Sequence, residues 1–286
     1  MAGSSSDNVA ATRGPLVAIG GAEDKTSELE VLTRVFTLAP EGEEEITLIA
    51  TASGEPEEVL PVYQAAFDRL GADRVHALDI RERQDAANAR NVRLVQTSGC
   101  IFFTGGDQLR LTNVLGGSPM LGAIRERLDA GAVVAGTSAG AMALTATMIY
   151  DGAAADALHK GAVKMTAGLG LVDGLIIDSH FLERGRFTRL MEVGATNPEH
   201  LGVGLGEDAA VIVHANGTLE AVGPGHVIII DSRGMASSNV AELSMGEPVA
   251  VENMVMHALI SGHGFDVGAR RYLVPDALRD YLADTP

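Results

Sequence analysis

The chain has 286 residues, and its 38 acidic and 21 basic side chains give a formal net charge of −17 at pH 7. Apolar residues make up 46% of it and aromatic residues 4%, which predicts a globular core of Ala, Val, Leu and Ile and argues against disorder or a fibre. The negative charge also argues against a nucleic-acid partner, because binding to a phosphate backbone needs a cationic face.

The cysteine count and the composition of two segments indicate in which cellular compartment the protein lies. Cys100 is the only cysteine, so no disulfide can form within the chain, which is typical of a reducing compartment. Residues 1–13 contain no apolar stretch suited to a signal peptide, and we expect them to form a flexible tail. Residues 130–150 carry no charge, but their Gly and Thr content predicts a strand, a turn and a helix rather than a membrane span. We therefore expect a cytoplasmic protein without membrane contact.

Short apolar strands alternate with helical patterns along the first half of the chain. Strands are expected at 16–19, 46–50, 75–78, 101–103 and 133–135, with helices near 29–38, 56–70 and 121–128 and a further helical stretch before residue 101. Apolar strands separated by helices are typical of a parallel sheet that is covered on both faces. The pattern predicts an α/β fold, a three-layer sandwich with a mainly parallel sheet.

The later sequence predicts an antiparallel extension of that sheet. Strands are expected at 175–177 and 201–205, with a helix at 184–193 between them, and at 211–213, 219–222 and 227–230. Asn216-Gly217 is a strong signal for a hairpin turn between two of these strands. Since no composition break or Pro-rich linker divides residues 14–286, we expect them to form a single α/β catalytic domain.

Residues 136–140 read Gly-Thr-Ser-Ala-Gly and have the Gly-x-Ser-x-Gly pattern of a nucleophile elbow between a strand and a helix. Larger flanking side chains would clash where the backbone turns sharply enough to expose the Ser138 hydroxyl. The helix that follows would direct its unpaired N–H groups toward the same point. Ser138 is therefore the candidate nucleophile, and an ordinary tight turn is the alternative interpretation.

A serine hydroxyl needs a base, and the base needs a carboxylate that holds its tautomer. His180 is the candidate base, because it directly follows the strand expected at 175–177, where α/β proteins assemble their sites. Sequence position leaves four candidate carboxylates open: Asp151, Asp156, Asp178 and Glu207.

A backbone oxyanion hole is expected beside the nucleophile. Gly106 lies in the turn after the strand at 101–103, and its N–H would be paired with that of Ala139. Loss of one such donor typically raises the barrier by about 3–4 kcal/mol.

Several motifs occur together in one order along the chain. They are IGGAED at 19–24, FTGGDQ at 103–108, GTSAGA at 136–141, DSHF at 178–181, arginines at 184, 186 and 189, and GLGE at 204–207. Over about residues 14–232 they closely resemble the cyanophycinases, serine exopeptidases of the peptidase E (aspartyl dipeptidase) family. The resemblance implies a glutamine-amidotransferase-like (flavodoxin-like) sandwich, with Ser in place of Cys at the elbow.

The resemblance also implies roles for site residues. Ser138 would be the nucleophile, His180 the general base and Glu207 the acidic member, with Asp156 in reserve. The family cleaves cyanophycin, a poly-aspartate with an arginine on each side-chain carboxyl, into β-Asp-Arg dipeptides. Three arginines would hold carboxylates and carbonyls of this polymer, although an ordinary solvated helix face is the alternative for them. The substrate-binding set would be Asp107, Gln108, Asp178, Ser179, Arg184, Arg186 and Arg189.

Some questions remain open at this stage. Typical cyanophycinases read Asp-Gln-His where this chain has Ser179, which leaves the preference for Arg or Lys side chains undecided. Alternative functions are an aspartyl dipeptidase acting on short N-terminal-Asp peptides, an α/β-hydrolase esterase, in which the His usually lies much farther from the Ser, and a non-catalytic binding module. No cofactor or metal is expected, because no ligand cluster has clear spacing. The resemblance suggests a homodimer.

Overall fold

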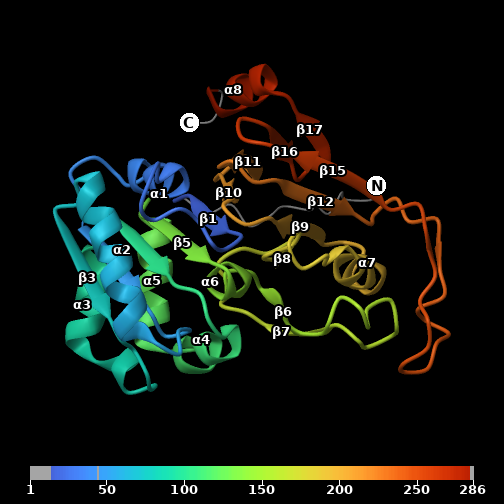
Figure 1. The fold of residues 1–286 in the computed structure, drawn as a ribbon, viewed down its shortest axis with the longest axis horizontal. Helices are drawn as coiled ribbons and strands as arrows, with labels where there is room; N and C mark the ends of the chain where they lie inside the picture. The colour runs from blue at the N-terminus through green and yellow to red at the C-terminus, as the bar shows by residue number, and fades with distance from the viewer. Residues whose placement is uncertain (1–13, 44, 284–286) are drawn as a thin grey trace, which may run out of the picture.

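The computed structural model describes residues 14–43 and 45–283, and the tail predicted at 1–13 lies outside these described residues. A nine-stranded sheet carries helices on both faces, and a separate four-stranded sheet stands beside it (Figure 1). The predicted α/β fold class is confirmed. Within the described ranges, no helix is long and apolar enough to cross a membrane.

Five parallel strands form one half of the main sheet. Their order is β1-β5-β4-β2-β3, and each strand runs parallel to its neighbours. The carboxyl ends of parallel strands share one edge, and the loops that build a site meet there. The bounds are β1 Leu16–Ile19, β2 Glu45–Ile49, β3 Arg74–Leu78, β4 Cys100–Phe103 and β5 Val133–Thr137.

Alternate side chains of these strands enter two different hydrophobic cores. On β4, Cys100 and Phe102 pack in the core that also contains residues of the first two helices. Ile101 and Phe103 face the opposite core, beneath the next three helices. This alternation on strands buried on both faces produces the three layers. The helices are α1 Glu30–Thr37 and α2 Pro56–Leu70 on the first face, and α3 Ala89–Thr97, α4 Gln108–Leu115 and α5 Pro119–Asp129 on the second, with a short 3-10 turn at Asp85–Ala87.

Four antiparallel strands extend the main sheet beyond β1. The predicted hairpin is present as β10 (Ala210–Val213) and β11 (Thr218–Val222), which pairs antiparallel to β10. Next to it lie β16 (Gly264–Asp266) and β17 (Arg271–Leu273), followed by helix α8 (Pro275–Ala283). The C-terminal segment therefore completes this sheet.

The strands expected at 175–177, 201–205 and 227–230 are not part of the main sheet, which corrects the prediction. The last of them is β12 (Val227–Asp231), and all three belong to the second sheet, of order β15-β12-β9-β8. Glycine on β9 permits close packing in this second sheet, because a Cβ at Gly204 would lie 2.5 Å from the ring of Phe181. Phe181 thus packs directly on the β9 backbone, within the hydrophobic core that both sheets share. The remaining members are β8 Leu175–Asp178, β9 Leu201–Leu205 and β15 Val255–Leu259, with helix α7 (Phe187–Thr196) packed on β9 and β12.

The short helix α6 (Ala139–Ala143) lies where the two sheets meet (Figure 1). It contacts β1 and β5 of the main sheet and β8 of the second sheet. Strand ends from both sheets therefore converge at the start of α6. Two small ribbons complete the fold, β6 (Thr147–Asp151) with β7 (Lys164–Ala167) and β13 (Ser237–Ser238) with β14 (Val251–Glu252).

Candidate active site

Ser138 lies in the sharp turn between β5 and α6, with a φ of 52°. The two flanking glycines have a steric reason to be there. A Cβ at Gly136 would lie 2.5 Å from the carbonyl carbon of Gly140, and one at Gly140 would lie 2.6 Å from the oxygen of Phe103. Only glycine fits these positions, so the elbow anticipated from the Gly-x-Ser-x-Gly pattern is built by close backbone packing.

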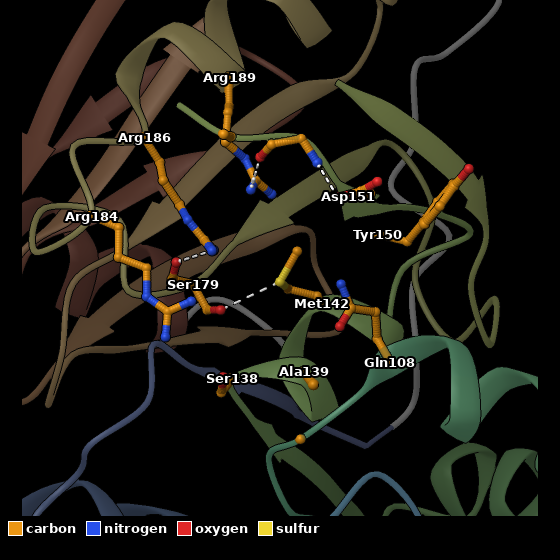
Figure 2. A pocket seen from close by; sticks show the side chains of 13 residues that line it. Gln108, Ser138, Ala139, Met142, Tyr150, Asp151, Ser179, Arg184, Arg186 and Arg189 are labelled. Carbon is orange, nitrogen blue, oxygen red and sulfur yellow. Dashed lines mark hydrogen bonds between the residues drawn. The ribbon is translucent and has the colours of Figure 1, made fainter. Parts of the chain in front are cut away.

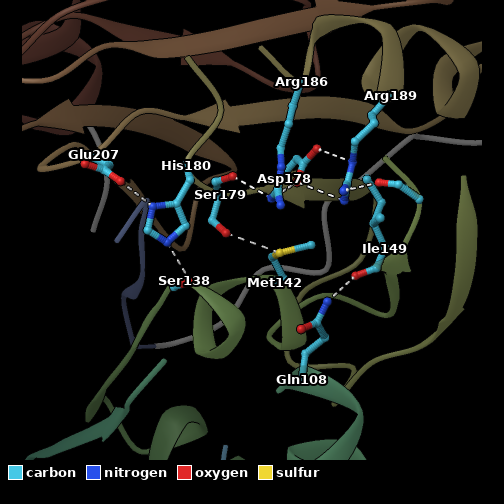
Figure 3. A network of polar contacts seen from close by, with 11 residues as sticks. Gln108, Ser138, Met142, Ile149, Asp178, Ser179, His180, Arg186, Arg189 and Glu207 are labelled. Carbon is cyan, nitrogen blue, oxygen red and sulfur yellow. Dashed lines mark hydrogen bonds and ion pairs between the residues drawn. The ribbon is translucent and has the colours of Figure 1, made fainter. Parts of the chain in front are cut away.

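Ser138, His180 and Glu207 form a chain of polar contacts (Figure 3). Ser138 Oγ lies 3.0 Å from His180 Nε2, and His180 Nδ1 lies 2.7 Å from Glu207 Oε1. The imidazole side chain is 14% exposed and that of Glu207 is 41% exposed, so the chain is open to solvent at its acidic end. This is the geometry in which a carboxylate orients an imidazole toward a serine hydroxyl.

The structure places the other three candidate carboxylates elsewhere. Asp178 lies between two arginines and does not contact His180. Asp151 forms an exposed ion pair with Lys164, at 3.1 Å. Asp156 lies in the loop between β6 and β7. Glu207, at the end of β9, is the one of the four that contacts the imidazole.

The two residues predicted to form the oxyanion hole, Gly106 and Ala139, line the cavity beside Ser138. Among the described residues, neither N–H has a hydrogen-bond acceptor. The turn after β4 packs closely on the elbow, since a Cβ at Gly105 would lie 3.3 Å from Ser138 Cβ. The oxyanion hole at these two N–H groups stays a prediction.

A cavity of about 380 Å³ opens next to Ser138. Figure 2 shows three arginine side chains on one side of it and Tyr150, Asp151 and Gln108 on the other. The cavity therefore carries a cationic wall in a protein whose net charge is −17. Its lining residues are Gly106, Gln108, Ser138, Ala139, Met142, Tyr150, Asp151, Gly152, Ala153, Ser179, Arg184, Arg186 and Arg189.

Asp178 holds two of these arginines together (Figure 3). Arg186 Nη1 lies 2.9 Å from Asp178 Oδ1, and Arg189 Nε lies 3.0 Å from Oδ2. Burial raises the pKa of Asp178 to about 6, against the opposing effect of Arg189 and Arg186. Burial likewise lowers the pKa of Arg186. The carboxylate thus holds two arginines of the cationic wall in position, and its role in shaping a substrate pocket stays a prediction.

The three arginines are not equivalent. Arg189 is 5% exposed, and it also donates from Nη1 to the Gly152 carbonyl at 2.6 Å. Arg186 donates to the Ser179 carbonyl at 2.8 Å. Arg184 is exposed, and its guanidinium has no hydrogen-bond or ion-pair partner among residues 14–43 and 45–283. Arg184 is therefore the arginine with every donor available to a ligand.

Three further predicted binding residues have different surroundings. Gln108 donates to the Ile149 carbonyl at 2.9 Å, which fixes its amide in the cavity wall. Ser179 is buried, and its hydroxyl lies 3.3 Å from Met142 Sδ. Asp107 differs from the prediction because it does not line the cavity: its carboxylate caps α4 by accepting from Leu109 N–H at 2.8 Å. An N-terminal cap explains an aspartate at this position without a ligand.

Four lining residues were not predicted as part of the site: Met142, Tyr150, Gly152 and Ala153. Met142 belongs to α6, and the other three belong to the end of β6 and the loop after it. Tyr150, Gly152 and Ala153 carry no motif, and the tertiary contact between β6 and β8 brings them to the cavity, whereas Met142 reaches it from α6, directly after the elbow. Within the described part of the chain, no group of three His, Cys, Asp or Glu side chains is arranged to hold a metal ion.

Comparison with known proteins identifies the family to which the chain belongs. Residues 16–220 match peptidase family S51. A cyanophycinase of Nostoc sp. is 36% identical over 264 residues, which cover 92% of this chain and 89% of that protein. A cyanophycinase of Geminocystis herdmanii is 35% identical, with coverages of 88% and 92%.

A crystal structure of a peptidase from an acI-B1 Actinobacterium shares the fold, with a TM-score of 0.64 at 21% identity, covering 90% of this chain and 98% of that chain. The match to peptidase family S51 and the identity to the two cyanophycinases confirm the family resemblance inferred from the motifs. The chain belongs to peptidase family S51 and is a serine-type peptidase.

Proposed function

We propose that the protein is a serine exopeptidase that hydrolyses cyanophycin and releases β-Asp-Arg dipeptides. One observation carries this proposal: the hydroxyl–imidazole–carboxylate chain of Ser138, His180 and Glu207 opens into a cavity with an arginine wall. The names of its relatives, cyanophycinases at 34–36% identity, support the choice of substrate.

The reaction begins with proton transfer from the nucleophile. His180 Nε2, 3.0 Å from Ser138 Oγ, takes the hydroxyl proton as Oγ attacks the carbonyl between two aspartates. The imidazolium that forms is stabilised by the carboxylate of Glu207, 2.7 Å from Nδ1. This step needs no movement of the three side chains.

The N–H groups of Gly106 and Ala139 stabilise the tetrahedral oxyanion. His180 then returns its proton to the leaving main-chain amine, and the acyl-enzyme on Ser138 forms. A water molecule, deprotonated by the same imidazole, hydrolyses this ester and restores the serine. One base thus serves both half-reactions.

The charges of the cavity match both ends of an arginyl-aspartate unit. Each arginine of cyanophycin has a free carboxylate and a guanidinium. Arg184, exposed and unpaired among the described residues, is suited to the carboxylate, because a guanidinium binds carboxylates in a bidentate manner. Asp151 and Tyr150 on the facing wall are suited to the substrate guanidinium. This arrangement favours the polymer over a peptide without arginine.

Ser138→Ala should abolish release of β-Asp-Arg from cyanophycin while leaving the fold intact, because no other hydroxyl of the residues that the structure describes contacts His180 Nε2. The measurement is chromatography of soluble products after incubation with insoluble cyanophycin, with circular dichroism as the control for folding. Near-normal turnover by the variant would exclude Ser138 as the nucleophile. If the wild-type protein cleaved Asp-Leu but left cyanophycin intact, the dipeptidase alternative would replace this proposal.

Glu207→Ala should lower kcat about 10²- to 10⁴-fold with little change in KM, since the carboxylate orients the base and does not bind substrate. Asp156→Asn is the matched control, because the Asp156 carboxylate lies in the loop between β6 and β7 and does not contact the imidazole. This variant should retain wild-type kcat. Steady-state kinetics of the two variants decide the assignment. Full activity of Glu207→Ala together with loss in Asp156→Asn would reverse it.

Asp178→Asn should raise KM about tenfold at pH 8 with a smaller effect on kcat, because the loss of a charge-assisted hydrogen bond releases Arg186 and Arg189 from their fixed positions. Wild-type KM should rise as pH falls through about 6, since the Asp178 carboxylate with its raised pKa takes up a proton there and loses its charge. The KM of the variant should not show this rise. KM measured between pH 5 and 8 tests the prediction, and an identical rise in both proteins would contradict it.

We also propose that the protein is a cytoplasmic homodimer. The buried Cys100, the only cysteine, suits a reducing compartment. Strand β15 is an edge strand of the second sheet and exposes Val255 and Met256, at 42% and 59%. An exposed apolar edge strand is a template for pairing with a second chain.

Light scattering should therefore give twice the 29.7 kDa of one chain. Met256→Asp should shift the mass toward the monomer by placing a charge on the β15 edge. Met245→Asp, at another residue with an exposed side chain (73%), is the matched control and should not change the mass. A mass of 29.7 kDa for the wild-type protein would contradict the dimer.

A further inference from the structure

Three consecutive carbonyl groups at the end of β1 bind the three segments that carry the proposed triad. The Ile19 oxygen accepts from Ser138 N–H at 2.9 Å, and the Gly20 oxygen accepts from His180 N–H at 2.8 Å. The Gly21 oxygen accepts from Asp208 N–H, directly after Glu207, at 2.9 Å. The backbone of residues 19–21 therefore binds the proposed nucleophile, the proposed base and Asp208, the residue that follows the proposed acid.

The three N–H groups bound in this way belong to residues with positive φ. Ser138, His180 and Asp208 have φ of 52°, 47° and 52°, a region that residues other than glycine rarely occupy. Such conformations persist only where the surrounding structure holds them. The carbonyls of residues 19–21 supply a hydrogen bond at each of the three strained positions.

The backbone of Gly21 also forms the surface on which the His180 ring rests. A Cβ at Gly21 would lie 2.4 Å from Cε1 and 2.5 Å from Nε2 of the imidazole. Nε2 is the atom that contacts Ser138 Oγ. Any side chain at Gly21 would therefore displace the ring from the hydroxyl.

The side chain of Glu23 connects the segment after β1 to neighbouring elements. Its side chain is buried, and Oε2 accepts from the hydroxyl of Thr137, the residue before the nucleophile, at 2.7 Å. Oε1 accepts from the hydroxyl of Tyr63 on α2 and lies 3.4 Å from Lys25 Nζ. Burial and the Glu23 charge hold the pKa of Tyr63 well above its usual range, so its hydroxyl stays a donor. The carboxylate thus ties the segment to the elbow and to a helix of the outer layer.

We propose that residues 19–23, here named the β1 turn, set the geometry of the triad, and that Gly21 and Glu23 are positioning residues for His180 and Ser138. The inference rests on the proposed triad but not on the choice of substrate. None of these residues lines the substrate cavity. The β1 turn should therefore affect the reactivity of the hydroxyl and leave the affinity for substrate nearly unchanged.

Gly21→Ala tests this role, with Gly71→Ala as the matched control. Both glycines have positive φ, 102° and 93°, but a Cβ at Gly71 would meet nothing within 4 Å. The backbone strain of the substitution is therefore shared, and the contact with the imidazole is specific to Gly21. The melting temperatures of the two variants measure the shared strain.

The first readout is the rate at which phenylmethylsulfonyl fluoride labels Ser138, followed by mass spectrometry, because it is independent of substrate. Gly21→Ala should label about 100-fold more slowly than the wild type, the usual effect of a displacement of about 1 Å at a reacting group, and Gly71→Ala should label normally. On cyanophycin, kcat should fall in parallel and KM should stay within about twofold. Equal labelling of Gly21→Ala and the wild type would overturn the inference alone. A wild-type Ser138 that resists the reagent would overturn the proposed nucleophile and the inference with it.

Glu23 variants keep the proposal testable if Gly21→Ala does not fold. Glu23→Ala removes the anchor and should slow labelling of Ser138 about tenfold. Glu23→Gln preserves the size and one acceptor oxygen, and should restore most of the rate. A folded Glu23→Ala protein that labels at the wild-type rate would overturn the role of the anchor.

Discussion

The contact between Ser138 Oγ and His180 Nε2 joins two sheets that share no strand. Ser138 follows β5 of the nine-stranded sheet, whereas His180 and Glu207 follow β8 and β9 of the four-stranded sheet. Proton transfer over 3.0 Å tolerates little displacement, so the position of one sheet relative to the other limits the proposed chemistry. A common hydrophobic core fixes this position, since Val134 of β5 and Ile176 of β8 belong to the same cluster. The geometry of the proposed site thus depends on hydrophobic packing that lies far from the hydroxyl.

A packed core positions strands, but it does not determine the direction of a side chain beyond a strand end. Ser138 and His180 both lie just past the ends of their strands, and their positive φ angles differ from those of strands and right-handed helices. The β1 turn supplies what the core cannot, because hydrogen bonds and the absence of a side chain at Gly21 act at these two residues directly. The division is physical: apolar burial sets the distance between the sheets, and directional bonds set the angles.

The features that could be predicted from the sequence are those that depend on local structure. The elbow at Ser138 needs only two glycines between a strand and a helix, and His180 needs only to follow a strand. The acidic partner could not be chosen from position, because the contact of Glu207 with the imidazole depends on the pairing of β8 with β9 in the second sheet. Nothing in the periodicity of these strands distinguishes a second sheet from an extension of the first. Tyr150 could not be predicted from the sequence for the same reason, because β6 reaches the cavity through its contact with β8 in the second sheet.

The short run from Asp178 to His180 contributes both to the arginine wall and to the proposed triad. Alternation along a strand would place both side chains on one face, yet β8 ends at Asp178 and His180 has a φ of 47°. The carboxylate of Asp178 therefore faces the arginine wall while the imidazole faces Ser138. Ser179 lies between them, and its carbonyl binds Arg186. The backbone carbonyl next to the proposed base thus helps to hold the arginine wall, so a single residue, Ser179, separates Asp178 from the proposed base His180.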